Sequence, residues 1–487
     1  MLAVLTQVLL TQVFVDTRRE NGRIITNTCL FGELYMPHFR DPVHGFIYVS
    51  KEEQKIIDSA PFQRLRNIRQ LATTYLVYHG AEHTRFGHSL GVMHLVTRTF
   101  NSVVSNTPNL FRENTEENDL VATWYRQILR LIALTHDLGH PPFSHAAEEL
   151  FAEGIEHEQY TKMIIEETEI SSYITEIGRT LHETLANRMN VSTDELIIKY
   201  NIRPITPQLV WMIYGEKPKV HDPEYIWPDF VFLNSFMDGE LDCDKMDYLL
   251  RDARYCGVTY GKYDLDRFIS TLTVHTSKDE KVMQLAITSG GIQAFEEFVL
   301  ARYFMFVQVY FHKSRRHFDR LLILGLKEIL PDGKFPDKIM EYLKWDDVRA
   351  ICEMRCSGGS SSQKFLRRQA MECVYESPVH SNNSEKKLSR ILLDNVKSKF
   401  PNNEFQYDDV DKKAHKLLPS MYSADDDSGA GVKVIDRHTK EVRNVMDCSL
   451  ILKGMIDKIF ICRIYADGEA VGGIKEYMSK MHAEYSM

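Results

Sequence analysis

The sequence has few cysteines for its length, and none of them form a CxxC pair. Eight cysteines are scattered through 487 residues. This pattern excludes a zinc ribbon and argues against a disulfide framework, and it is typical of reduced thiols inside a cell. The chain also lacks an apolar run of transmembrane length, and the apolar residues 2–15 have no basic residue before them, as a signal sequence would. We therefore expect a cytoplasmic protein with no membrane partner.

An excess of positive charge is also missing. The formal net charge is −9 and the isoelectric point lies near 6.1, which argues against nucleic acid as a partner but leaves small anionic substrates open. Three arginines, Arg64, Arg66 and Arg69, lie in a helix predicted for residues 62–71. Such a cluster is typical of a solvated face. Its alternative uses are to bind nucleic acid, a phosphate or the nucleotide of a partner subunit.

The chain does contain a short histidine-rich segment, HDLGHPPFSH, which begins at His136. The spacing of apolar residues before this segment predicts a buried helix. The polar side chains at the end of that helix need hydrogen-bond or metal partners, because burying them without partners is costly. Gly139 and the two prolines after it end the helix, and Ser144 can cap a second helix at residues 146–151. The adjacent side chains of His136 and Asp137 cannot share one helix face. As a pair they suit a metal ion whose other ligands come from distant residues.

Three further segments are predicted to be helical. A helix over residues 89–104 follows a histidine cluster that includes His88, and an amphipathic acidic segment at residues 238–252 contains Asp244. Any one of these histidines is more often a structural residue than a ligand, but their density favours a polar site. The acidic segment is either a charged solvated face or one wall of a polar cavity. The aromatic-rich residues 292–324 predict one or two core helices.

The second half of the chain contains two breaks in composition. Glycine and serine dominate residues 357–362, and a second break runs from Asp425 to Gly431. Both predict flexible connections, with a charged helical segment between them. Alternating apolar residues then predict a hairpin at residues 432–442 and a strand at residues 459–465.

The histidines and aspartates predict a metal site. Two imidazoles and two carboxylates would hold a divalent ion such as Mn, Fe, Mg, Zn, Co or Ni, which the residues do not distinguish. Such an ion activates water and neutralises phosphoryl charge, as phosphoester hydrolysis requires. The alternative is that these are buried structural polar groups. The candidate ligands are His88, His136, Asp137 and Asp244, with His140, His145 and His157 as proton carriers or phosphate donors and Arg85, Lys245 and Arg302 as further phosphate contacts.

The order of these H, HD and D motifs resembles the HD-domain phosphohydrolase superfamily. The longer strings FQRLR, HTRFGHSLG, HDLGHPPFSH and DKMDYLLRD narrow the resemblance to the deoxynucleoside triphosphate triphosphohydrolases, over about residues 36–325. The resemblance implies hydrolysis at the α-phosphorus, which gives a deoxynucleoside and intact triphosphate. It also implies that the four candidate ligands hold the metal.

The resemblance assigns further roles position by position. His145 corresponds to the catalytic histidine, supported by Glu148 where relatives have an aspartate, and His140 and His157 correspond to histidines that contact the phosphates. The positions that match contacts to the triphosphate and the deoxyribose are Gln70, Leu71, Arg85, Lys245, Tyr248, Asp252, Arg302 and Tyr310.

Members of this family carry activator nucleotides between the subunits of a homo-oligomer. We accordingly expect GTP or a deoxynucleotide as activator and a tetramer as the assembly. The matching positions are Asp58, Gln63, Arg66, Asp264 and Arg267. The chain departs from the family at Pro37, where a lysine is expected, and at Thr288, Gly290 and Ala294, so the identity of the activator stays open.

We therefore expect a mainly α fold. It comprises an N-terminal extension at residues 1–40, an HD-domain helical core at residues 41–325 and a smaller α+β region at residues 326–487 that serves oligomerisation or regulation. Translation starting at Met1 or at Met36 fits the sequence equally. Two other functions stay open: hydrolysis of another nucleotide phosphoester, against which the sugar-contact positions argue, and catalytically silent nucleotide sensing, against which the intact metal quartet argues.

Overall fold

The computed structural model describes residues 17–20, 23–26, 37–215, 228–276, 283–412, 431–455, 459–468 and 470–486. Helices dominate this part of the chain, which confirms the predicted mainly α fold. Within it, no helix combines the length and the apolar character that crossing a membrane requires. The expectations for residues 2–15 and 425–430 concern positions outside the described residues.

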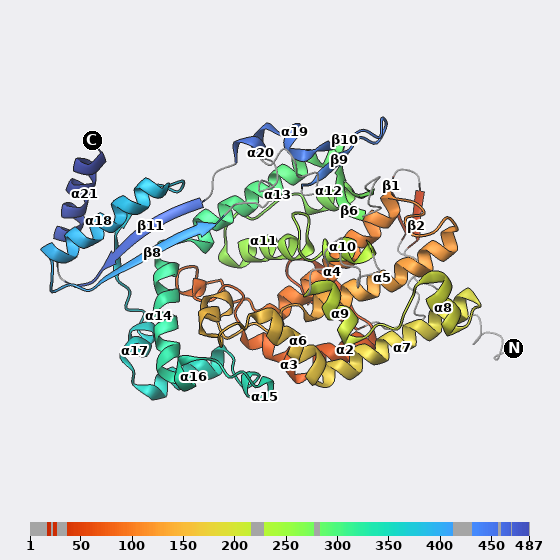
Figure 1. The fold of residues 1–487 in the computed structure, drawn as a ribbon, viewed down its shortest axis with the longest axis horizontal. Coiled ribbons are helices and arrows are strands. Elements are labelled where there is room, and N and C mark those ends of the chain that lie inside the picture. Colours follow the sequence, from red (N-terminus) through yellow and green to blue (C-terminus); the bar gives the residue numbers. More distant parts are fainter. Residues whose placement is uncertain are drawn as a thin grey trace.

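A bundle of helices forms the body of the molecule (Figure 1). Its central helices are α4, Arg85–Asn106, and α5, Thr115–Thr135, which pack along each other, while α11, Cys243–Cys256, packs on α4. The apolar residues of α5 recur at helical spacing and are buried. The other helices of the body are α2 Lys51–Asp58, α3 Ala60–Arg64, α6 His157–Glu167, α7 Glu169–Met189, α8 Thr193–Tyr200, α9 Pro207–Tyr214, α10 Pro228–Asn234, α12 Leu265–Ser270, α13 Ile292–Met305 and α14 Lys313–Ile329.

Two predictions for long helices are confirmed, and a third is wrong. Helix α4 contains residues 89–104, and residues 292–324 form α13 and α14, joined by the π-helical turn Phe306–Tyr310. The helix predicted for residues 62–71 instead ends early. It consists of α3 and the 3-10 turn Leu65–Asn67, after which the chain extends. The reason is tertiary: the amide of Arg69 donates to the carboxylate of Asp347 and that of Gln70 donates to the His83 carbonyl, in place of intrahelical acceptors.

Short sheets lie on and beside the helical body. Hairpins are formed by β1 with β2 and by β3 with β4, and the predicted C-terminal hairpin of β9 and β10 is confirmed. β9 also pairs in parallel with β6, so the tail of the chain extends the sheet of β5 and β6. The bounds are β1 Thr17–Glu20, β2 Arg23–Thr26, β3 His38–Asp41, β4 Gly45–Tyr48, β5 Leu272–Thr276, β6 Met283–Thr288, β9 Lys433–Ile435 and β10 Val442–Asn444.

A second sheet, in the order β7-β11-β8, extends from one end of the body, with α18 and α21 at its far end (Figure 1). Its central strand β11 confirms the strand predicted at residues 459–465 and is buried throughout. Helix α14 continues across residue 325 and links the body to this region. The bounds are α15 Ile339–Tyr342, α16 Asp347–Ser357, α17 Ser360–Leu366, β7 Glu372–Glu376, α18 Asn383–Lys399, β8 Phe405–Lys412, α19 Val445–Cys448, α20 Leu450–Gly454, β11 Ile459–Ala466 and α21 Val471–Ser486.

Two predictions for this region are wrong. The glycine and serine segment at residues 357–362 is not a flexible connection, because α17 begins within it and Glu328 accepts hydrogen bonds from the amides of Ser361 and Ser362. The segment that follows is not purely helical either, since it contains β7 and β8 on each side of α18. Both stretches are held in place by residues that are distant from them in the sequence.

The Glu53 carboxylate fixes α2 against α5 and provides a test of this packing. It is buried and accepts hydrogen bonds from the Ser50 amide, Gln127 and Arg130. Burial by itself raises the pKa of Glu53, but these donors hold it below its ordinary value of 4.5. The ion pair therefore stabilises the fold above pH 4.5, and this contribution is lost as the pH falls through the lower folded-state pKa.

We expect Glu53→Gln to lower the free energy of unfolding at pH 7 by roughly 3 to 5 kcal/mol, because it removes the buried carboxylate that forms the ion pair with Arg130. Urea unfolding at pH 7 and at acidic pH measures this, and the difference from wild type should shrink in acid. Glu167→Gln, at an exposed position on α6, is the matched control. An equal, small change in both variants would contradict the assignment.

Candidate metal centre and catalytic cluster

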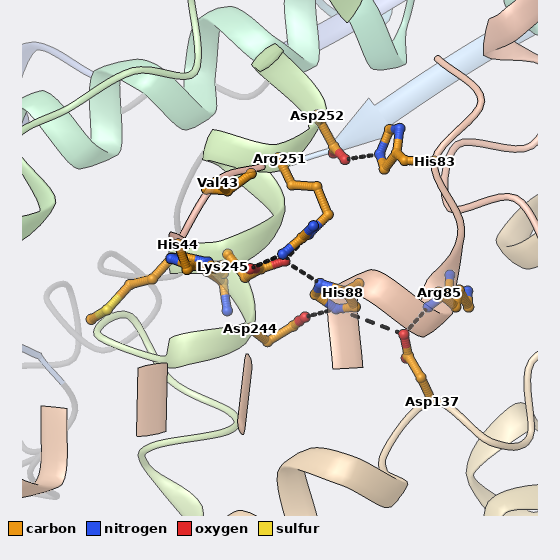
Figure 2. Close-up of polar contacts among 12 residues, drawn as sticks. Val43, His44, His83, Arg85, His88, Asp137, Asp244, Lys245, Arg251 and Asp252 are labelled. Atoms are coloured by element: carbon orange, nitrogen blue, oxygen red, sulfur yellow. Dashed lines mark hydrogen bonds and ion pairs between the residues drawn. The ribbon is translucent and has the colours of Figure 1, made fainter. Parts of the chain in front are cut away.

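The four predicted ligands converge in space. Atoms of His88, His136 and Asp137 that could bind a metal lie within 4.8 Å of one another. The Oδ1 atom of Asp244 lies 2.9 Å from Nε2 of His88 and 3.9 Å from Nε2 of His136. Figure 2 shows His88 between the carboxylates of Asp137 and Asp244. The sequence alone could not show this convergence.

Each ligand stands at a helix end. His88 lies in the first turn of α4 and Asp244 in the first turn of α11, while His136 is the C-terminal cap of α5 and Asp137 follows it. Helix ends leave backbone groups that need polar partners, so buried polar side chains are favoured there. The Asp242 side chain caps α11 by accepting from the Lys245 amide, which sets the start of that helix and the position of Asp244.

Hydrogen bonds fix which nitrogen of each imidazole faces the centre. His136 donates from Nδ1 to the Ala133 carbonyl at 2.7 Å, and Nδ1 of His88 lies 2.8 Å from the carboxylate of Asp247. Both Nε2 atoms therefore point toward the carboxylates. Nε2 of His136 is buried and has no hydrogen-bond partner. A buried orphan acceptor beside two carboxylates fits a divalent cation.

Asp247 organises the groups behind the site. Its side chain is fully buried and lies 2.6 Å from Nε2 of His44, and it accepts two hydrogen bonds from Arg251 at 2.7 and 2.9 Å. Arg251 also donates to Asp41 at 2.9 Å. This network was not predicted from the sequence. The sequence features that could have indicated it are the DPVHG turn around His44 and the second aspartate of DKMDY.

The charged groups of the candidate metal centre shift the pKa values of one another. Burial by itself lowers the pKa of His88, but Asp244 and Asp247 raise the pKa to about 10. Burial raises the pKa of Asp137, but the Arg85 guanidinium, 2.6 Å away, and the two ligand histidines hold it well below its usual range. The carboxylates are therefore ionised at neutral pH. A bound cation would displace the proton of His88.

The predicted catalytic residues form a second cluster around the Glu148 carboxylate. Its Oε1 atom lies 2.9 Å from Nδ1 of both His145 and His157, and the rings of His140 and His157 are 4.0 Å apart. Burial raises the pKa of Glu148, but these histidines hold it well below its usual range. Burial lowers the pKa of His157, but Glu148 and Glu158 together raise it above its ordinary value. Burial and nearby cations hold the pKa of His140 far below its usual range.

Two residues with left-handed backbone conformations precede His145. Phe143 and Ser144 have φ values of 59° and 53°, which side chains with a Cβ rarely adopt. The predicted helix cap at Ser144 is wrong, because its hydroxyl donates to the Arg69 carbonyl at 2.6 Å and accepts from Arg85 at 2.7 Å. The strained turn therefore fixes the guanidinium that holds Asp137.

Two of the expected triphosphate contacts, Lys245 and Arg302, lie in one neighbourhood, while the third, Arg85, pairs with Asp137. Lys245 donates to the Gly239 carbonyl at 2.9 Å and to Asp242, and its charge acts on those of Tyr248 and Arg302. Two guanidinium nitrogens of Arg302, Nε and Nη1, are buried without a hydrogen-bond partner. Lys245 is thus already paired with Asp242, whereas the Arg302 guanidinium, whose Nη1 lies 3.7 Å from Glu240, keeps donors for an anion.

The expected sugar contacts form a neighbouring group. The Tyr310 hydroxyl donates to Asp252 at 2.7 Å, and the other oxygen of Asp252 lies 2.8 Å from Nε2 of His83. Gln70 belongs to the same group because its backbone N–H donates a hydrogen bond to the His83 carbonyl. The side-chain oxygen of Gln70 is buried and has no hydrogen-bond partner. Leu71 beside it is buried.

The expected activator positions occupy two separate places. Gln63 accepts from Arg66 at 2.8 Å, and Asp58 accepts from Gln54 one helical turn earlier. Asp264 and Arg267 lie together on α12, where Asp264 accepts from the Arg267 amide. Among the described residues, no hydrogen bond or ion pair joins the two places.

The Asp247 network yields a prediction about metal affinity. Asp247→Asn should weaken the binding of a divalent metal roughly 10- to 100-fold, because His88 loses the carboxylate that orients it. Competition titration with a metal indicator measures this on folded protein, with circular dichroism to confirm folding. Asp119→Asn, an exposed aspartate on α5, should bind metal as wild type does. Unchanged affinity in folded Asp247→Asn would count against the network.

Comparison with known protein families matches two parts of the chain. Residues 85–202 match the model described as the HD domain, and residues 263–389 match the HD associated region. His88, His136 and Asp137 lie inside the first range, and Asp244 lies between the two.

Individual relatives agree with these matches. The uncharacterized protein YwfO of Bacillus subtilis is 34% identical over 58% of this chain and 54% of its own length. Deoxynucleoside triphosphate triphosphohydrolase SAMHD1 of Danio rerio is 30% identical over 50% of this chain and 38% of its own length. The chain thus spans about half or less of these relatives. A crystal structure of a hypothetical protein from Aquifex aeolicus superposes with a TM-score of 0.67 at 29% identity, over 91% of this chain and 99% of that one. The chain therefore contains an HD domain at residues 85–202, followed by an HD-associated region at residues 263–389.

Proposed function

We propose that this protein is a metal-dependent hydrolase that splits deoxynucleoside triphosphates into a deoxynucleoside and inorganic triphosphate. The observation that carries the proposal is the convergence of two imidazoles and two carboxylates around the buried, unpartnered Nε2 of His136. The similarity to a relative named as a deoxynucleoside triphosphate triphosphohydrolase supports the choice of substrate.

His88, His136, Asp137 and Asp244 would hold the metal. A divalent ion bound there lowers the pKa of a coordinated water and neutralises charge on a phosphoryl oxygen. Asp244 is the most accessible of the four, with about a third of its side chain exposed, so the open side of the site faces it. Arg85 keeps Asp137 ionised and oriented by its direct ion pair.

His145 is the candidate proton donor to the leaving 5′ oxygen. Its Nδ1 atom contacts Glu148, which leaves Nε2 for the substrate, and its side chain is 63% exposed. Glu148 orients the imidazole through this contact. His140 and His157 lie beside it and supply hydrogen bonds to the phosphates.

The remaining contacts separate the charged and neutral ends of a nucleotide. Arg85, Lys245 and Arg302 would hold the triphosphate, since each is a buried or nearly buried cation. Gln70, Leu71, Tyr248, Asp252 and Tyr310 would enclose the deoxyribose. The Asp252 carboxylate and the buried oxygen of Gln70 offer acceptors for its 3′ hydroxyl.

We also propose a homo-oligomer activated by GTP or a deoxynucleotide, with residues 326–487 contributing to its assembly. The two places formed by Gln63 with Arg66 and by Asp264 with Arg267 support this proposal. Both groups carry exposed polar side chains and lie apart on one chain, as a site shared between subunits requires.

The reaction is tested by incubating the metal-loaded protein with each deoxynucleoside triphosphate singly, with all four together, and with ribonucleotides. We expect deoxynucleoside and triphosphate as products, separated by chromatography, and no turnover after chelation. His136→Ala and Asp137→Ala should abolish turnover while the protein stays folded, because each removes a ligand. Turnover only in mixtures would support activation. Normal turnover by a folded double variant would falsify the proposal, and binding without turnover in every metal would favour a nucleotide sensor.

His145 is tested separately from the metal. His145→Ala should lower kcat by roughly 10²- to 10⁴-fold, the usual contribution of a general acid, while metal content stays that of wild type. Steady-state kinetics with metal analysis measures both quantities. His438→Ala, at an exposed position in the β9–β10 turn, is the control. A kcat within a few fold of wild type would exclude His145 as the proton donor.

A further inference from the structure

A polar cavity of about 620 Å³ adjoins His145 on the side formed by α14 and β8. The 3-10 segment Ser144–Leu150 contributes His145 and Glu149, α14 contributes Arg316, Asp319 and Arg320, and β8 contributes Gln406. An ion pair between Arg316 and Asp408 of β8, 2.7 Å apart, closes one wall. The volume is ample for a purine ring.

The charges that line this cavity make it unsuitable for a triphosphate. Three carboxylates, those of Glu149, Asp319 and Asp408, face two guanidinium groups, those of Arg316 and Arg320. The Asp409 side chain projects from the other face of β8, where it pairs with Lys386 at 2.7 Å. A highly charged anion would be repelled by this balance. A neutral group that both donates and accepts hydrogen bonds would fit it, because the wall offers donors and acceptors together.

The cavity also lies next to the candidate sugar contacts. The loop that carries Gln70 and Leu71 continues to Thr73, whose hydroxyl donates to Asp319 at 2.6 Å. Arg315 donates to the Tyr310 carbonyl and lies 3.3 Å from Asp319. A nucleotide with its α-phosphorus at His145 and its sugar at these residues would therefore direct its base toward α14.

We propose that this cavity binds the nucleobase of the substrate and that Arg320 and Glu149 read it, with guanine as the best-fitting base. Their side chains are each 46% exposed and their charged groups lie 3.9 Å apart. Lys327 also contacts Oε1 of Glu149, at 3.3 Å, so Oε2 is the carboxylate oxygen that a ligand would use. Guanine presents the acceptors O6 and N7 to an arginine fork and the donors N1–H and N2–H to a carboxylate. The inference rests on the proposed function and adds base selection to it.

The strand that completes the cavity lies outside both matched families. The HD-associated region ends at residue 389, and β8 begins at Phe405. Gln406 and Asp408 project from the same face of β8, because alternate residues share a face. One wall of the cavity thus belongs to a part of this chain that the family models do not cover, whereas Glu149 and Arg320 lie within the matched ranges.

The test compares kcat/KM for the four deoxynucleoside triphosphates in wild type, Arg320→Gln and Glu149→Gln. We expect each variant to lower kcat/KM for dGTP roughly 10- to 100-fold, the discrimination of one bidentate base contact. The values for dCTP and dTTP should change less than about threefold, since pyrimidines lack this pattern. Arg179→Gln, at an exposed salt bridge on α7, is the matched control.

Binding of phosphonate analogues, in which carbon replaces the scissile 5′ oxygen, gives a second readout that does not need turnover. A selective loss of dGTP-analogue binding in the two variants supports the cavity whether or not wild type hydrolyses any substrate. If wild type hydrolyses deoxynucleotides but the base preference of both variants is unchanged in both assays, the base proposal is overturned and the proposed function stands. If wild type hydrolyses none, the proposed function fails, and unchanged analogue binding then overturns the base proposal as well.

Discussion

The buried carboxylate of Asp247 is the constraint on which the centre of this protein depends. An ionised group without solvent is costly unless several donors compensate it. Here His44, His88 and Arg251 provide this compensation, from the β3–β4 turn, from α4 and from α11 itself. Three segments far apart in the sequence are thereby held together at one point. The orientation of His88, and with it the geometry of the candidate metal centre, follows from that arrangement.

A second buried carboxylate orders the other side of the site. Asp347 on α16 accepts hydrogen bonds from the amides of Phe143 and Arg69. Burial raises its pKa to about 6, against the effect of these donors. Left-handed conformations such as that of Phe143 cost on the order of 1 to 3 kcal/mol and persist only where surrounding structure holds them. The HD-associated region thus supports the turn that presents His145.

Electrostatics divide the surroundings of His145 into two sides. The buried cations Arg85 and Lys245 lie beside the candidate ligands Asp137 and Asp244, and Arg302 lies near Lys245. The cavity along α14 and β8 carries more carboxylates than guanidinium groups. A nucleotide has the same polarity, with its charge at one end and a neutral, hydrogen-bonding base at the other. These two environments would be complementary to the two ends of the proposed substrate.

The sequence by itself determined the local features of the protein. Helical periodicity identified α4, α5 and α13 with α14, and alternation identified β11 and the β9–β10 hairpin. The H, HD and D motifs identified four candidate ligands, whose side chains the structure brings together. Tertiary structure decided the rest. The segment after Arg64, the serines near Ser362 and the hydroxyl of Ser144 all have partners distant in the sequence, namely Asp347, Glu328 and Arg85. Such hydrogen bonds produce no periodic pattern of residues, so they could not be predicted from the sequence. The Asp247 network and the cavity beside His145 could not be predicted for the same reason.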